Sequence, residues 1–132
     1  MRRRLIRSAV VAGLLLLIGG SILVTRYRAS VHQQGLETSL KWARLAPLPV
    51  PLDEVTVTTE GSMFTLAFRI CFVASASDIQ RWLAESPGTC SILPETNGNI
   101  QRYGITPGGG AQHAELTVDL ESGEVRIYVY WS

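Results

Sequence analysis

The sequence predicts an α+β protein in which a single N-terminal transmembrane helix precedes a small domain of order β-β-α-β-β-β. Three observations predict it: an uncharged apolar run near the N-terminus, alternating apolar residues in the C-terminal part, and one amphipathic stretch between two of the alternating segments. The 132 residues allow one domain of ordinary size. With 46% hydrophobic and 17% charged residues, the composition sustains a core and excludes general disorder.

The apolar run Ser8–Val24 contains no charged residue and follows a cluster of arginines. As a helix it is about 26 Å long, and Leu5 and Ile6 extend it toward the roughly 30 Å of a hydrocarbon core. We therefore expect a membrane-spanning segment at about Leu5–Val24. It lies within an N-terminal region, residues 1–28, that combines a basic n-region with a signal anchor.

An uncleaved anchor is the preferred interpretation of this region. A cleaved signal needs small residues at positions −3 and −1, but cleavage after Ala29 places Tyr27 at −3 and cleavage after Ser30 places Arg28 there. Two alternatives stay open: a protein secreted after signal cleavage, and a buried soluble helix. Because more cations precede the apolar run than follow it, we expect a cytoplasmic N-terminus and an extracytoplasmic C-terminal domain.

Residues 29–52 are predicted to form a stalk and a Pro-rich linker. Apolar residues of the first part recur at roughly helical spacing, whereas Pro47, Pro49 and Pro51 prevent a helix and favour an extended chain. The small α+β domain is therefore assigned to residues 53–132.

Alternating apolar and polar residues predict the strands of this domain. A helix is expected after Ser77, with Gln80 completing a capping box, and Pro94–Asn99 is expected to form turns. The predicted strands lie at residues 55–59, 64–72, 100–106, 114–120 and 125–131. For the last two strands we prefer a register with Leu120 opposite Val125, although a loop with a left-handed Gly123 would shift it by one residue.

The only two cysteines, Cys71 and Cys90, suggest a disulfide. A domain of about 80 residues is only marginally stabilised by its core, and closing such a loop contributes roughly 3 kcal/mol. An extracytoplasmic location would favour the bond. Two buried free thiols are the alternative, expected if the domain is cytosolic.

Residues 1–30 carry a net charge of +6 and residues 31–132 carry −5. An acidic domain lacks the positive face that binding to phosphates requires, so we expect no nucleic acid partner. The sequence contains no CxxC, HExxH, GxSxG, Walker or Rossmann pattern. His113 and Glu115 lack a third ligand, and we assign no catalytic, cofactor-binding or metal-binding residue.

Tyr103, Tyr128 and Tyr130 are the candidate residues of an interaction face, although packing in the core is an alternative for them. We therefore expect a non-enzymatic binding or structural module of the cell envelope, whose partners are the membrane and another envelope protein. A membrane-tethered enzyme or small-ligand binder is the alternative. It would use the aromatic sheet face and the glycine-rich connector at residues 107–110.

Overall fold

The computed structural model describes the backbone of residues 2–132 and the side chains of residues 13–132. The arginines of the predicted n-region and the first turns of the predicted apolar span therefore lie outside the described side chains. The chain divides into two compact units, Met1–His32 and Gln33–Ser132, and each is described by itself.

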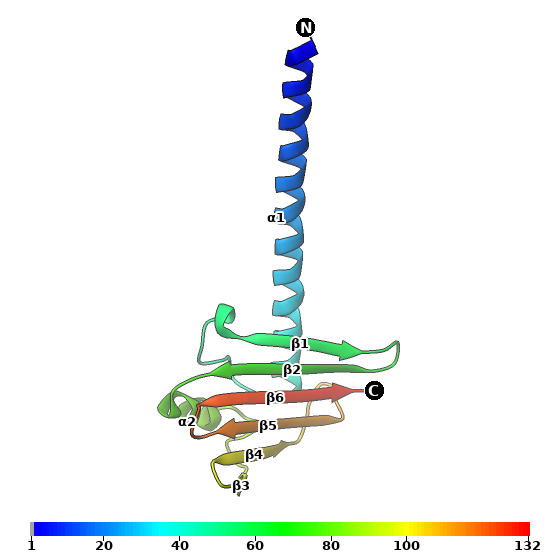
Figure 1. Ribbon diagram of the computed structural model, residues 1–132. Coiled ribbons are helices and arrows are strands. Elements are labelled where there is room, and N and C mark those ends of the chain that lie inside the picture. Colours follow the sequence, from blue (N-terminus) through cyan, green and yellow to red (C-terminus); the bar gives the residue numbers. More distant parts are fainter. Residues whose placement is uncertain (1) are drawn as a thin grey trace. The chain divides into compact units, whose positions relative to one another are not determined.

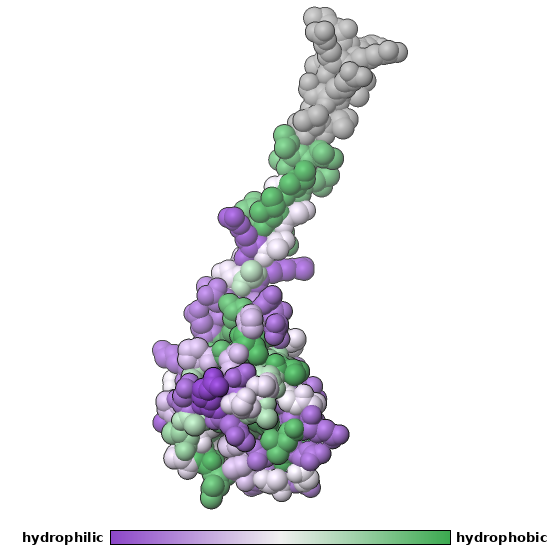
Figure 2. Space-filling model, turned by 90° about the vertical axis from the view of Figure 1, so that its left-hand side faces the viewer, coloured by the Kyte–Doolittle hydropathy of each residue, from purple (hydrophilic) through white to green (hydrophobic). Residues whose placement is uncertain are grey.

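Helix α1 (Arg2–Trp42) contains the whole first unit that the structure describes and continues into the second. Leu14–Leu17 each expose between 59% and 78% of their surface, and in Figure 2 apolar side chains gather at the start of the described part of this unit, with hydrophilic ones further along the helix. By length and composition, Gly13–Trp42 is able to cross a membrane. A signal sequence near the N-terminus has the same properties.

The second unit is built on a six-stranded antiparallel sheet of order β1-β2-β6-β5-β4-β3 (Figure 1). Helix α2 (Ala76–Glu85) connects β2 to β3, and a short 3-10 turn, Leu52–Glu54, precedes β1. The strands are β1 (Thr56–Gly61), β2 (Leu66–Val73), β3 (Glu95–Asn97), β4 (Ile100–Ile105), β5 (His113–Asp119) and β6 (Glu124–Trp131). An α+β architecture with an N-terminal apolar helix is thus confirmed.

Strand β6 lies between β2 and β5, although it is last in the sequence. Its residues alternate strictly: Val125, Ile127 and Val129 are each at most 1% exposed. Arg126 and Tyr128 point to the other face, as the two-residue period of a strand requires. One face of the sheet is therefore apolar and buried beneath helices, while the other is polar.

Helix α2 covers the apolar face with Ile79, Trp82 and Leu83. The Trp82 ring meets Phe72 edge-on at 5.5 Å between centroids, and its Nε1 donates a hydrogen bond of 3.0 Å to the carbonyl of Ala46. The helix begins two residues earlier than expected, because the Ser75 hydroxyl rather than Ser77 accepts from a backbone N–H of the first turn.

Part of the segment predicted as stalk and linker packs into the same core. Leu36, Ala43 and Leu45 are buried, and partly buried apolar residues up to Val50 pack against them. Gly35 lets α1 pack closely against Phe68 of β2. A Cβ at position 35 would lie only 3.1 Å from the Phe68 ring, which is closer than carbon atoms normally pack. The apolar stripe read from the sequence is thus a core-facing stripe of α1 within the second unit.

Two strand predictions were wrong. The region expected to form turns contains β3, a three-residue strand whose residues are all exposed, so no apolar alternation announces it. In the last hairpin, Val118 rather than Leu120 lies opposite Val125. Both expected registers fail, although Gly123 is left-handed with φ of 71°. The connection keeps four residues but begins one residue earlier, at Leu120, because the Asp119 carboxylate accepts hydrogen bonds from the backbone N–H groups of Glu121 and Ser122 at the end of β5.

We predict that Gly123→Ala destabilises the second unit by about 1–3 kcal/mol, because a side chain is strained at this positive φ. Its Cβ would also collide with the backbone carbonyl of Ala74. Urea unfolding of the detergent-solubilised full chain measures the effect. Gly104→Ala is the matched control, since its Cβ would meet no atom within 4 Å. Equal stability of the two variants would contradict the strained turn.

Candidate functional site

The face of the sheet opposite the helices is the first candidate site, and we call it the open face. Its side chains come from β1, β2, β6, β5 and β4, and their positions follow from the strand registers. It comprises Thr56, Thr58, Arg69, Cys71, Arg102, His113, Glu115, Thr117, Arg126, Tyr128 and Tyr130, all of them at least partly exposed.

Tyr128 lies at the centre of the open face, between Arg69 on β2 and Glu115 on β5. The Arg69 guanidinium lies 4.6 Å from the centre of the Tyr128 ring, a cation–π distance. The His113 ring lies 5.8 Å from the same ring on its other side. A shallow hollow of about 310 Å³ beside Tyr128 is lined by these strands and includes Arg126.

Each arginine of the open face has an acidic neighbour. Arg69 lies 3.2 Å from Glu60, Arg102 lies 3.4 Å from Glu115, and Arg126 contacts Glu124. More than half of each arginine side chain is exposed. Such exposed pairs are worth at most about 1 kcal/mol, so a partner that offers its own carboxylate replaces them at little cost.

The three tyrosines singled out from the sequence do not lie together. Tyr128 and Tyr130, two residues apart on β6, share the open face. Tyr103 lies on the helix-covered side of β4, opposite Leu116, and is 8% exposed. Burial raises the pKa of its phenol. Sequence reasoning missed Arg69, whose position at the centre of this face follows from the pairing of β2 with β6.

The expected disulfide is absent, and that prediction was wrong: Cys71 and Cys90 are both free thiols. Cys71 lies on the open face opposite Arg126, because Ile70 and Phe72 on either side of it point into the core. Cys90 lies in the turn after α2, where its Sγ is 3.8 Å from the carbonyl of Pro87. Partial burial, reinforced by nearby Glu124, raises the pKa of Cys71.

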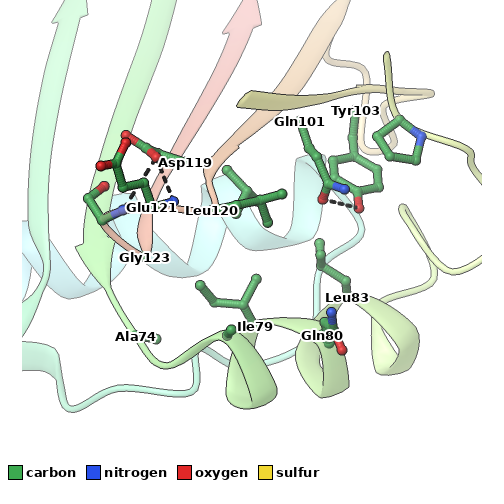
Figure 3. A pocket seen from close by; sticks show the side chains of 14 residues that line it. Ala74, Ile79, Gln80, Leu83, Gln101, Tyr103, Asp119, Leu120, Glu121 and Gly123 are labelled. Atoms are coloured by element: carbon green, nitrogen blue, oxygen red, sulfur yellow. Dashed lines mark hydrogen bonds between the residues drawn. The ribbon is translucent and has the colours of Figure 1, made fainter. Parts of the chain in front are cut away.

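A second hollow lies on the helix side, between α2 and the turn that joins β5 to β6, and we call it the α2 cavity (Figure 3). Its volume is about 420 Å³. Its apolar lining includes Ile79, Leu83, Val118 and Leu120, and its polar lining includes Gln80, Gln101, Tyr103, Asp119, Glu121 and Ser122.

The glycine-rich connector serves the packing of α1. The N–H of Gly108 donates a hydrogen bond of 2.8 Å to the carbonyl of Trp42. Gly109 has φ of 62°, and a Cβ there would lie 2.7 Å from the indole of Trp42. These glycines therefore let the β4–β5 connection approach the end of the helix closely.

Among the described side chains, no three histidine, cysteine, aspartate or glutamate residues are grouped as metal ligands. His113 and Glu115 lie 3.9 Å apart, at the limit of an ion pair. Comparison of the chain with known protein families, curated proteins and solved structures gave no match.

We predict that the melting temperature of the full chain is the same with and without a reductant, because no bond joins Cys71 to Cys90. Alkylation of the unfolded protein without reduction should label both thiols, as mass spectrometry will detect. A melting temperature that falls on reduction in the native chain, but not in Cys71→Ser, would show instead that the disulfide forms.

Proposed function

We propose that the chain is a single-pass membrane protein whose second unit is a non-enzymatic binding or structural module of the cell envelope. In this proposal α1 anchors the chain, the N-terminus is cytoplasmic and the sheet unit is extracytoplasmic. The apolar, exposed Leu14–Leu17 region supports the anchor, since leucines on every side of a helix require an apolar surrounding. The larger number of arginines before the apolar run supports the orientation.

The open face is the observation that carries the binding role. Tyrosine and arginine are enriched at protein interfaces because each combines contact area with hydrogen bonding. Here Tyr128 and Tyr130 stand side by side with Arg69 on a face that no helix of the described chain covers. Rigid strands hold these side chains in place before binding, which reduces the entropic cost of association.

The charge of the open face indicates the kind of partner. Its arginines alternate with carboxylates, which favours a surface that carries both signs of charge, such as another envelope protein. The alternative of a ligand site formed by this face and the glycine-rich connector has less support, because Gly108 and Gly109 are packed against Trp42.

We predict that Tyr130→Ala weakens association with the partner about tenfold or more while leaving the melting temperature nearly unchanged. Interface tyrosines often contribute this much, and Tyr130 is only half-buried on a strand whose core residues remain. The measurement is the fraction of the full chain in its membrane complex, resolved by native electrophoresis in mild detergent.

Arg81→Ala is the matched control, because Arg81 is an exposed residue of α2, on the other side of the sheet. It should leave the complex intact. An unchanged complex with Tyr130→Ala would contradict the role of the open face. A large loss of stability would instead show that Tyr130 stabilises the fold.

Protease digestion of a C-terminal tag in intact spheroplasts tests the orientation of the chain. Protection of the tag until lysis would show that the sheet unit lies in the cytoplasm.

A further inference from the structure

The two edges of the sheet differ in length and in protection. At one edge β3 spans three residues, Glu95–Asn97, and so short a strand offers little to a further strand. At the other edge β1 spans six residues, Thr56–Gly61, and pairs with β2 without a bulge. It contains no proline and no lysine, the residues that commonly protect an exposed edge, and its one charged residue, Glu60, has Arg69 beside it. Strand β1 is therefore open to pairing along its outer side.

The pairing of β1 with β2 determines which backbone groups face outward. The N–H of Ser62 donates a hydrogen bond of 2.9 Å to the carbonyl of Thr65, so these two residues form a bonded pair next to the turn. Bonded and non-bonded pairs alternate along antiparallel strands. By this alternation, the residues bonded to β2 are Thr56, Thr58 and Glu60. The residues that direct both N–H and C=O away from β2 are Val57, Thr59 and Gly61. We call these outward groups the β1 edge.

The β1 edge has free backbone groups and exposed apolar neighbours. Within the part of the chain that the structure describes, no hydrogen bond reaches these outward groups. Leu52, in the turn before β1, is 58% exposed, while Met63 and Phe64, in the turn after it, are 89% and 75% exposed. A partner that lies along β1 would satisfy the backbone groups and approach the apolar side chains at both ends of the strand.

We propose that the β1 edge binds an extended segment of another polypeptide, which adds a further strand to the sheet. The donors and acceptors of this edge recur at the spacing of a strand, and an extended peptide is the ligand that matches them. The side chains of β1 include Thr56, Thr58 and Thr59, which are exposed and uncharged. Threonines on neighbouring strands pair through their hydroxyls, and β-branched residues fit a pleated surface. The segment is therefore uncharged and rich in threonine, valine and isoleucine.

A second copy of this chain does not fit the β1 edge if α1 is the membrane anchor of the proposed function. Two β1 strands paired antiparallel are related by a rotation of 180° about an axis normal to the sheet. That rotation reverses every direction in the plane of the sheet, including that of the last turns of α1, which pack on the sheet through Leu36 and Ala43. The two helices would leave their sheets in opposite directions, which two anchors in one membrane forbid. A segment of a different chain carries no such restriction.

The β1 edge is distinct from the tyrosines of the open face. Tyr128 and Tyr130 lie on β6, and β2 separates that strand from β1. A segment bonded to the edge lies beside the sheet, whereas a partner of the tyrosines lies against its face. Tyr130→Ala therefore leaves the edge intact, and a failure of either proposal is visible without the other.

The test measures hydrogen exchange of the β1 amides in the full chain in lipid nanodiscs, resolved to single residues by electron-transfer mass spectrometry. The probe is the blocked peptide Lys-Thr-Val-Thr-Val-Thr-Lys at saturating concentration. The control peptide has two consecutive prolines at its centre, which remove a donor from each edge of the peptide. We expect the probe to slow exchange at Val57, Thr59 and Gly61 at least tenfold, and the control peptide to change nothing.

The alternation of the effect identifies strand addition. The amide of Thr58 is already bonded to β2, so its exchange rate should stay the same when the probe binds. Fast exchange at all three outward amides in the presence of the probe would overturn the proposal. Equal slowing at Thr58 would show a general stabilisation of the unit and would also overturn it.

Variants of Thr59 locate the binding on the edge. Thr59→Pro removes the central outward N–H without removing a bond to β2, and proline is tolerated where the N–H of an edge strand faces solvent. It should weaken probe binding at least tenfold at a nearly unchanged melting temperature. Thr59→Val keeps the N–H and the β-branched shape, and as the matched control it should bind the probe like the native chain. Probe binding that survives Thr59→Pro would place it elsewhere and overturn the proposal.

The assignment to a different chain is tested in nanodiscs that each hold two copies and no probe. The outward amides should exchange as fast there as in nanodiscs with one copy. Protection of Val57 and Thr59 by a second copy alone would assign the edge to self-association and overturn the proposal.

Discussion

The two-sided character of β6 is the constraint on which the second unit depends. This strand pairs with β2 on one side and β5 on the other, so it joins the first hairpin to the meander of the last four strands. Val125, Ile127 and Val129 must all face the helices, because a slip of one residue would expose them and bury Arg126. The same alternation fixes Tyr128 and Tyr130 on the open face. Core and candidate site are thus two consequences of one pattern.

The end of α1 is the second element that holds the unit together. Trp42 packs against Phe68 at 5.7 Å between ring centroids. Gly109 of the glycine-rich connector lies close against the Trp42 indole. Ser39 is fully buried, and its hydroxyl donates to the carbonyl of Gly35, so a polar side chain is accommodated without an unsatisfied group. One helix therefore supplies both the apolar segment of the first unit and a layer of core in the second.

Features set by residue periodicity were predictable from the sequence, whereas features set by long-range pairing were not. The alternation of β5 and β6 and the amphipathic stripe of α2 are visible in single segments. The exposed strand β3 has no such signal, and the core position of Leu36 depends on the sheet that it meets. The disulfide prediction used the number of cysteines, the size of the domain, the loop length and the expected location. Strand parity directs Cys71 away from the helix layer, a fact that depends on knowing which face of β2 is buried.

Charge and aromatic area have different parts on the open face. Each of its arginines already has a carboxylate beside it, so charge contributes orientation, and affinity must come from the area of Tyr128 and Tyr130. Asp119, at the end of β5, continues the alternation of Glu115 and Thr117 toward this face. The backbone N–H groups of Glu121 and Ser122, together with nearby Arg126, lower its pKa. Its charge is therefore already compensated within the fold, and shape and aromatic contact, rather than an unpaired charge, determine selectivity on the sheet.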